Sequence, residues 1–327
     1  MKKIPITAIT GFLGSGKTTL LNHILENNQG LKIGVVVNDY GQINIDSKLI
    51  AARTDKTLEL TNGCMCCSLS SLELDEAISQ FAHPGSQIDY IIIEASGLAE
   101  PSDLAATLRA AMGRYTRLDS IIAIIDAYNL EKNAAEHDSA IRQIEYSDFV
   151  IINKTDLVPK SKVDDITKLI KGMNERVRIF TAKHAQVDVR LLLGQEPERA
   201  EHKEPGHKHK HAHDDYSSVS FETDKALDPL KFQNFVNKQI PNEVYRAKGF
   251  VNLGNKGHRR KYLFQLVGKR ADITWTDWGE EKPQTALVFI GKGFDKAKTL
   301  AQIEACIDPE PTKYDPGIEV VLPRREL

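Results

Sequence analysis

The sequence lacks any apolar run near the ~20 residues that a helix needs to cross a lipid bilayer. It has only four cysteines in 327 residues, and three of them are crowded into residues 64–67, where neighbouring thiols bridge poorly. It also lacks an excess of charge, since 43 Lys and Arg face 45 Asp and Glu for a net charge of −2. These shortages argue against a membrane protein, a disulfide scaffold and a basic nucleic-acid binder. We therefore expect a cytoplasmic protein with no nucleic-acid or membrane partner.

A glycine-rich segment follows the first apolar run. Residues 11–18 read GFLGSGKT and fill the pattern GxxxxGK[ST], between a strand-like run at 4–10 and a helix-like run at 17–28. Glycines let backbone N–H groups converge on phosphate oxygens, and the following helix points its positive end at the same charge. The pattern predicts a phosphate-binding loop in which Lys17 reaches the β- and γ-phosphates and Thr18 ligates Mg²⁺. The expected contacts of the loop are Gly11, Gly14, Ser15, Gly16, Lys17, Thr18 and Thr19.

A second nucleotide motif comes later in the chain. A short apolar strand at 149–152 is followed by NKTD at 153–156, and NKxD is the guanine signature of GTPases. Asp156 can accept hydrogen bonds from the N1–H and the exocyclic amine of guanine, an arrangement that adenine does not offer. We expect Asn153, Lys154 and Asp156 to bind the base; the alternative is a chance match of four loop residues. Lys183, in the sequence TAK at 181–183, resembles a further guanine contact.

The cysteine cluster lies between these two motifs. Residues 62–67 read NGCMCC, and a tight Asn-Gly turn could point the sulfurs of Cys64, Cys66 and Cys67 at one metal ion. Thiolates suit Zn²⁺, Co²⁺ or Cu⁺, with a further ligand or a water completing the coordination. A redox thiol pair and buried structural cysteines are the alternatives. The fourth cysteine, Cys306, lies far away in a helix-like segment.

The phosphate loop, CMCC, EASG at 94–97 and NKTD occur in this order, and together they resemble the CobW-like family of metal-handling GTPases. RAKGF at 246–250 and LVFIG at 287–291 resemble the smaller carboxyl-terminal domain of that family, so about residues 5–306 are covered. The resemblance implies a metallochaperone that binds Zn²⁺ or Co²⁺ at Cys64, Cys66 and Cys67. It also implies that GTP and Mg²⁺ control the metal, that a client metalloprotein receives it, and that the chain can form a homodimer.

Other functions share these motifs. A dedicated activator of one metalloenzyme, of the hydratase type, would carry all of them. A zinc storage or sensor protein would also keep them, with a vestigial GTPase. A P-loop kinase of a small metabolite is disfavoured by NKTD.

Acidic residues at strand ends supply the remaining candidates for catalysis beside Lys17 and Thr18. Asp39 follows the second strand, where a switch segment is expected, and can sense Mg²⁺ or the γ-phosphate. Many family members carry glutamate at the positions of Asp39 and Gln42; Gln42 removes a charge, which puts a metal or general-base role there in doubt. Glu94 occupies the place of a Walker B carboxylate, or is a buried acid paired with a lysine, and Gly97 can donate its N–H to the γ-phosphate. Asp126 is assigned only to the neighbourhood of the nucleotide.

Strand-like and helix-like runs alternate in the first 185 residues, which predicts an α/β fold of the P-loop NTPase type, with a parallel sheet and flanking helices. Residues 1–194 are assigned to this GTPase domain. The expected helices include 17–28 and 102–111. The expected strands are 4–10, 32–37, 89–93, 120–125, 149–152 and 177–180.

Composition changes after residue 194. Residues 195–215 have almost no large apolar side chain, which predicts a linker. Its histidines, His207, His209, His211 and His213, can bind metal weakly; a solvated spacer is the alternative.

From residue 216 to 307 the pattern predicts a small α+β domain with a mostly antiparallel sheet, followed by a tail at 308–327. Its expected strands are 219–221, 244–253, 261–267, 273–275 and 285–290, and its expected helices are 229–239 and 296–306.

Overall fold

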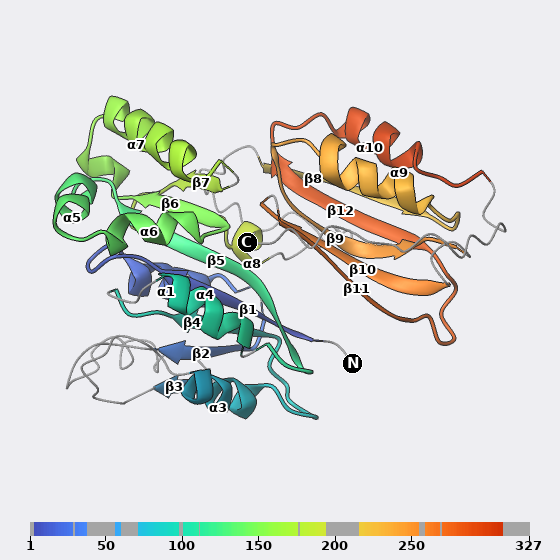
Figure 1. Cartoon of the computed structure of the whole chain (residues 1–327), viewed down its shortest axis with the longest axis horizontal. Helices are drawn as coiled ribbons and strands as arrows, with labels where there is room; N and C mark the ends of the chain where they lie inside the picture. The colour runs from blue at the N-terminus through green and yellow to red at the C-terminus, as the bar shows by residue number, and fades with distance from the viewer. Residues whose placement is uncertain are drawn as a thin grey trace, which may run out of the picture. The chain divides into compact units, whose positions relative to one another are not determined.

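The computed structural model describes residues 3–28, 30–37, 56–59, 71–97, 101–110, 112–175, 177–193, 216–254, 259–268 and 270–309. The chain divides into two compact units, Met1–Val189 and Arg190–Leu327. The elements of each unit are labelled in Figure 1.

The first unit is built on a seven-stranded sheet in the order β3-β2-β4-β1-β5-β6-β7, and every pair of neighbouring strands in it is parallel. Its strands β1, β2, β4, β5 and β6 are rich in Ile and Val, and the strands whose burial is described are almost wholly buried apart from parts of β5 and β7, as strands covered on both faces are. The strands are β1 (Ile4–Thr10), β2 (Ile33–Val37), β3 (Lys56–Glu59), β4 (Tyr90–Glu94), β5 (Thr116–Asp126), β6 (Phe149–Asn153) and β7 (Arg178–Thr181).

Helices lie against this sheet (Figure 1) and pack on it through apolar side chains. Leu74, Ile78 and Phe81 of α3 join Leu108 of α4 over the strand residues around Ile91. Contacts of α3 with α4, α4 with α6, and α6 with α7 make these four helices a continuous row. The helices of this unit are α1 (Lys17–Glu26), α3 (Ser71–Phe81), α4 (Pro101–Ala110), α5 (Leu130–Glu136), α6 (Ser139–Glu145), the 3-10 turn η1 (Thr155–Leu157) and α7 (Lys160–Met173). The short helix α8 (Val189–Leu193) begins at the last residue of this unit.

Parallel pairing places the carboxyl ends of the strands along one edge of the sheet, where open α/β sheets bind ligands. Ile9 of β1 pairs with Glu94 at the end of β4, and Asp126 at the end of β5 pairs with Asn153 at the end of β6. The strand register therefore gathers acidic and amide side chains beside the loop that follows β1.

The second unit contains a five-stranded antiparallel sheet in the order β11-β10-β9-β12-β8. Phe232 and Phe235 from the helical layer pack against Phe264 and Phe289 of the sheet, with ring centroids 5.4 and 5.9 Å apart for the pairs 232–264 and 235–289. The elements are β8 (Tyr216–Thr223), α9 (Pro229–Asn234), the π-helical turn η2 (Phe235–Gln239), β9 (Val244–Asn252), β10 (Arg260–Val267), β11 (Arg270–Asp277), β12 (Thr285–Lys292) and α10 (Lys296–Glu304).

The predicted fold class is confirmed, while some elements differ from expectation. The short strand β3 was not predicted, because KTLE carries neither an apolar run nor β-branched residues beyond one Thr, and it pairs only with β2. The predicted single helix 229–239 is two segments, because the N–H of Ile240 bonds the carbonyl of Phe235 and forms a π turn.

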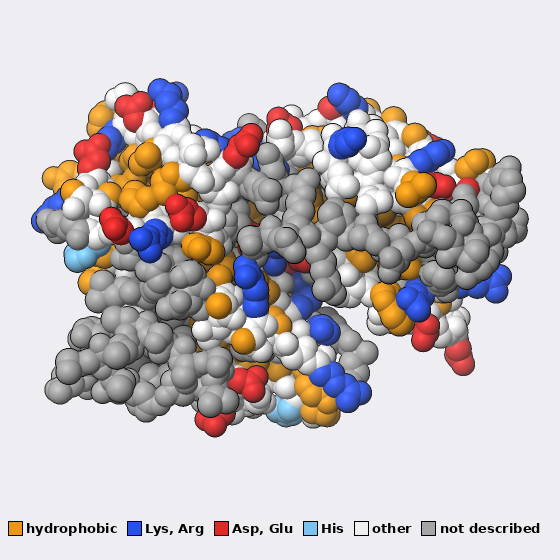
Figure 2. Space-filling view, viewed as in Figure 1, with side chains coloured by type: hydrophobic (Ala, Val, Ile, Leu, Met, Phe, Trp, Pro, Cys, Tyr) orange, Lys and Arg blue, Asp and Glu red, His pale blue; other side chains and the backbone are white. Residues whose placement is uncertain are grey.

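In the part of the chain that the structure describes, every helix is too short or too polar to cross a membrane. Figure 2 shows Lys, Arg, Asp and Glu side chains spread over the described part of the visible face.

Candidate functional site

The loop between β1 and α1 needs glycine at two positions because other strands approach it closely. A Cβ on Gly11 would lie 2.4 Å from the carbonyl oxygen of Ile124 in β5, and one on Gly16 would lie 2.6 Å from Nδ2 of Asn153. Gly16 also has φ 111° and caps α1. By contrast, a Cβ on Gly14 would meet nothing within 4 Å. The loop is thus pressed against β5 and β6 at its two ends and open in its middle.

The polar groups of this loop suit a polyphosphate. The ammonium of Lys17 donates to the carbonyl of Gly11 at 2.9 Å, so it is held over the loop. The hydroxyl of Ser15 is buried and has no hydrogen-bond partner among the described residues. The first turn of α1 begins at the same place with the N–H of Leu20 bonded to the carbonyl of Gly16. A cation, an unused hydroxyl and a helix amino end in one loop are what a phosphate site requires.

Thr18 and Glu94 lie together at the edge of the sheet. The Thr18 hydroxyl donates to Oε1 of Glu94 at 2.9 Å, and Glu94 is 4% exposed. A hydroxyl and a carboxylate are hard oxygen ligands of the kind that Mg²⁺ prefers, so these two side chains fit the ion that accompanies a nucleoside triphosphate.

The segment after β4 also reaches the phosphate loop. A Cβ on Gly97 would lie 3.0 Å from the backbone nitrogen of Leu13 and 2.7 Å from its Cδ2. Only a residue without a side chain allows this approach without displacement. The backbone of Gly97 therefore lies against Leu13 of the phosphate loop, close enough to respond to a ligand bound there.

Asn153 connects the phosphate loop to the base motif. Its Nδ2 donates to the carbonyl of Ser15 at 2.9 Å, and its Oδ1 accepts from the N–H of Ala185 at 2.8 Å. Asn153 is 2% exposed, so both ends of its amide are used inside the protein. Ala185 was not predicted; its only local signal is a loop after a predicted strand, and its left-handed backbone (φ 55°) becomes visible only in the structure.

A second tie joins the two predicted base loops. The N–H and hydroxyl of Thr155 both donate to the carbonyl of Ala182, at 3.2 and 3.0 Å. Asp156 and Lys183 project from these tied loops and are exposed. The structure thus brings together the predicted residues of the NKTD and TAK segments, with their charged side chains open to a ligand.

Lys154 and Asp126 form an ion pair beside these loops. The Nζ of Lys154 lies 2.8 Å from Oδ2 of Asp126, which is 4% exposed. Asp126 also accepts from the N–H groups of Tyr128 and Asn129 and from Nδ2 of Asn129. Burial raises the pKa of Asp126, but the hydrogen bonds from Lys154, Asn129 and Tyr128 outweigh it, so the pKa lies below its ordinary value. Sequence reasoning placed Asp126 only near the nucleotide, because its partner depends on the β5–β6 register.

Other predicted residues lie outside the described part of the chain. These are the switch residue Asp39, its neighbour Gln42, the thiols Cys64, Cys66 and Cys67, and the histidines His207, His209, His211 and His213. Among the residues that are described, no group of three or more His, Cys, Asp or Glu side chains is arranged to hold a metal ion.

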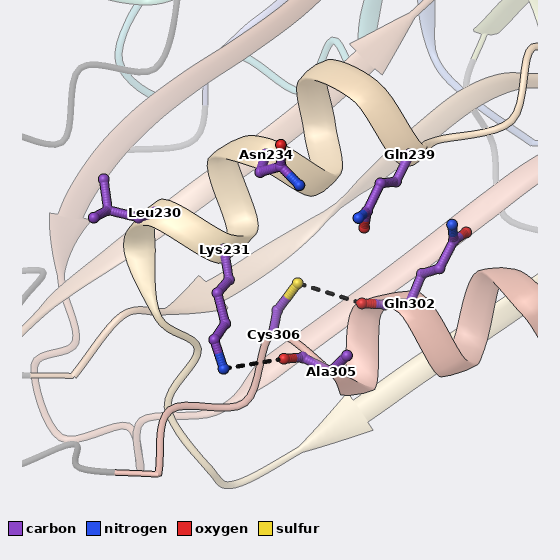
Figure 3. Close-up of a pocket in the computed structure, with 7 residues that line it drawn as sticks. All are labelled: Leu230, Lys231, Asn234, Gln239, Gln302, Ala305 and Cys306. Carbon is purple, nitrogen blue, oxygen red and sulfur yellow. Dashed lines mark hydrogen bonds between the residues drawn. The ribbon is translucent and has the colours of Figure 1, made fainter.

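Cys306 lines a hollow of about 370 Å³ between α9–η2 and α10 in the second unit. Figure 3 shows its sulfur and the side chains of Gln239 and Gln302 around this hollow. The thiol donates to the carbonyl of Gln302 at 3.4 Å. Burial raises the pKa of Cys306 to about 11, with smaller effects of Lys231, which lowers it, and Asp228, which raises it. Cys306 is therefore a protonated thiol at neutral pH, unlike a metal-ligating thiolate.

Comparisons with known proteins cover both units. Residues 5–181 match the family described as CobW/HypB/UreG, nucleotide-binding domain, and residues 216–307 match the cobalamin synthesis protein cobW C-terminal domain. The zinc chaperone YjiA of Escherichia coli is 31% identical over an alignment of 307 positions that covers 89% of this chain and 95% of that protein. The zinc chaperone CobW of a Sinorhizobium species is 32% identical over an alignment of 348 positions that covers 93% of this chain and 98% of that protein.

Two further comparisons are with a relative that matches part of the chain and with a solved structure. The zinc-regulated GTPase metalloprotein activator 1 of Dictyostelium discoideum is 34% identical over 231 residues, 59% of this chain and 48% of that protein. The crystal structure of Zn(II)-bound YjiA GTPase from E. coli is 28% identical, covers 94% of this chain and 100% of that chain, and has a TM-score of 0.43. With a family match over residues 5–181 and relatives above 30% identity along nearly the whole chain, the protein belongs to the CobW/HypB/UreG family and carries that family's CobW-type carboxyl-terminal domain.

Proposed function

We propose that this chain is a GTP-hydrolysing zinc chaperone. In this proposal it binds Zn²⁺, or Co²⁺, as cargo at Cys64, Cys66 and Cys67, and passes the ion to a client metalloprotein. The observation that carries the nucleotide part is the hydrogen bond from Asn153 to Ser15, which fixes the NKTD motif beside the phosphate loop. The names of the two long relatives, both zinc chaperones, support the choice of metal.

Guanine selectivity rests on Asp156. Its carboxylate is exposed on η1, in a loop that Thr155 ties to the TAK segment. A carboxylate accepts two donors from the guanine edge, whereas adenine presents an acceptor at N1 and would leave the carboxylate poorly paired. The same loops therefore select GTP over ATP.

Hydrolysis rests on positioning and charge. Lys17 would neutralise phosphate charge, Thr18 and Glu94 would hold Mg²⁺, and Gly97 would offer its N–H to the γ-phosphate. When bound, Mg²⁺ would supply further positive charge against the phosphates. Asp39 is proposed to respond to the γ-phosphate as part of a switch segment.

Metal release follows from the order of these residues in the chain. The cysteines lie between Asp39 and Glu94 in sequence, so one continuous segment joins the metal ligands to two groups that respond to nucleotide. Loss of the γ-phosphate would relax both ends of this segment. We infer that the thiolate site is distorted at that moment, and that the client then takes the ion.

The first test is nucleotide selectivity. GTP should bind the unmodified protein far better than ATP, and Asp156→Asn should reduce that preference roughly tenfold or more, the value of a hydrogen bond to a charged group. Calorimetric titration with GTP and ATP measures both. Lys17→Ala is the companion variant, because it should abolish GTP turnover while the melting temperature stays close to that of the parent. Equal affinity of the unmodified protein for GTP and ATP would refute the base assignment.

A second candidate function is a dedicated activator of one metalloenzyme. The name of the Dictyostelium relative, a metalloprotein activator, favours it. Both functions use the same nucleotide and metal residues and differ in the number of clients. Capture of a single stoichiometric partner from zinc-starved cells supports the activator, and metal transfer to several unrelated apoproteins supports the chaperone.

A further inference from the structure

The ion pair between Lys154 and Asp126 joins the base motif to a buried carboxylate that no nucleotide motif includes. Lys154 lies two residues before Asp156 and has a left-handed backbone (φ 59°), which is uncommon for a residue with a side chain. Its ammonium reaches Asp126 at 2.8 Å, across from the end of β6 to the end of β5. The long side chain of Lys154 is therefore held at both ends, by the backbone turn and by the carboxylate.

This restraint matters for the base. A guanine that hydrogen-bonds to Asp156 must lie beside residues 153–156. The methylene groups of Lys154 can then pack against the guanine ring and form one wall of the base site. A lysine side chain loses rotamer entropy when it is fixed on binding. If Asp126 already fixes the Lys154 side chain in the free protein, this entropy is not lost when the nucleotide binds.

We propose that Asp126 is a positioning residue for guanine nucleotides, which holds the Lys154 side chain in place as one wall of the base site. The proposal rests on the proposed function, because it assumes that the NKTD loop binds guanine.

Asp126 also has a local structural task. It accepts the N–H groups of Tyr128 and Asn129 through Oδ1 and the amide of Asn129 through Oδ2, so it shapes the turn before α5. A purely structural role predicts that damage to this turn, and not loss of the lysine partner, affects the nucleotide. The two roles differ in their partners: Oδ1 serves the backbone of the turn, whereas Oδ2 is shared by Lys154 and the amide of Asn129. A variant at Asn129 therefore separates them.

The experiment compares Asp126→Asn with Asn129→Ala. An asparagine keeps Oδ1 as the acceptor for the turn but loses the charge that attracts Lys154. The Asn129→Ala variant removes a bond from the turn but keeps the ion pair, and serves as the matched control. Calorimetry measures GDP, which uses the base and phosphate sites, and inorganic pyrophosphate, which uses the phosphate loop alone.

Asp126→Asn should weaken GDP binding about tenfold, because GDP must then order the Lys154 side chain itself, and leave pyrophosphate binding unchanged. Asn129→Ala should change both affinities less than about twofold. In a Lys154→Met background, where a stem of similar length remains without the charge, Asp126→Asn should have little further effect on GDP.

The proposal is overturned if Asp126→Asn leaves GDP binding intact, if Asn129→Ala weakens GDP equally, or if the loss persists in full in the Lys154→Met background. It is also overturned if GDP and pyrophosphate weaken together, since that result places the effect on the phosphate loop or on folding. Failure of the proposed function shows separately, as equal GTP and ATP affinity in the unmodified protein, and would remove the basis of both proposals.

Discussion

Cys306 shows how its surroundings decide what a cysteine does. It sits at 3% exposure beside the hollow between α9 and α10, and burial raises the pKa of its thiol to about 11. The nucleophilic and metal-binding form of cysteine is the thiolate, so this residue is inert near neutral pH. The chain thus separates a structural cysteine in the second unit from the clustered ones proposed to carry metal.

The raised pKa of Cys306 predicts how the stability of the protein depends on pH and how slowly this thiol is labelled. Because the folded-state pKa is raised above the ordinary 9.0, the stability it contributes is complete below about pH 9 and is lost as pH rises toward about 11. In the folded protein, iodoacetamide should label Cys306 far more slowly at pH 7.5 than it does in denaturant. Peptide mass spectrometry resolves this site from the other three cysteines. Labelling at equal rates in the folded and denatured protein would show that the thiol is accessible and ionisable.

Asn153 marks a limit of motif reading at the level of one residue. The NKTD motif predicts that Asn153 contacts guanine. In the structure the Asn153 side-chain amide instead donates to the carbonyl of Ser15 and accepts from the N–H of Ala185. Its contact with the base stays a prediction, while its task of tying two loops together is visible. A linear motif names residues that act together, but it does not say which of them bind the ligand and which hold the others.

The junction of β1 and the phosphate loop is the element most sensitive to added volume. In Gly11→Ala the new methyl would meet the carbonyl oxygen of Ile124 at 2.4 Å, so β5 or the loop must move, which typically costs about 1–3 kcal/mol. We expect a lower melting temperature and weaker pyrophosphate binding.

Gly172→Ala is the matched control, because this glycine lies in α7 and its Cβ would meet nothing within 4 Å. It should be neutral or stabilising by about 0.5–1 kcal/mol, since alanine favours helix. Circular dichroism melting of the two variants side by side tests the contrast. Equal stability of Gly11→Ala and the parent would mean that the junction is looser than the structure indicates.

Elements with a strong local pattern could be predicted, and those that depend on a neighbour could not. The run Ile4–Thr10 is a strand as predicted, since its apolar residues suit burial on both faces. The edge strand β11 extends over Arg270–Asp277, well beyond the predicted 273–275, because pairing with β10 and not hydrophobicity defines its polar ends. The π turn η2 depends on one bond from Ile240 to Phe235, which sequence does not reveal.

The candidate site shows the same division. Residues of the phosphate loop and the NKTD motif were predicted from their local patterns. The partnership of Asp126 with Lys154 was not, because it arises from parallel pairing of β5 with β6 between residues 28 positions apart. Sequence therefore indicated the segments that are proposed to bind nucleotide, and the structure shows the hydrogen bonds and the ion pair that hold these segments together.

At the scale of the whole molecule, the account joins a nucleotide site to a metal cargo. The proposed ligands Cys64, Cys66 and Cys67 should bind about one ion tightly, with an affinity that falls as pH drops, because thiols must lose protons to bind metal. Deletion of residues 202–213 should remove only weakly bound ions. Loss of the tight ion in that deletion would instead make the histidines primary ligands.

The central claim is that nucleotide and metal are coupled. By linkage, if GTP with Mg²⁺ changes Zn²⁺ affinity, Zn²⁺ must change GTP affinity by the same factor, typically worth ~1–3 kcal/mol or about 5- to 150-fold. The most direct measurement is a Zn²⁺ titration with and without a non-hydrolysable GTP analogue, with a Cys66→Ala, Cys67→Ala double variant as control. The account predicts different Zn²⁺ affinities in the two titrations of the unmodified protein, and a double variant that binds the analogue but no longer responds to metal. Identical Zn²⁺ affinities with and without the analogue would contradict it.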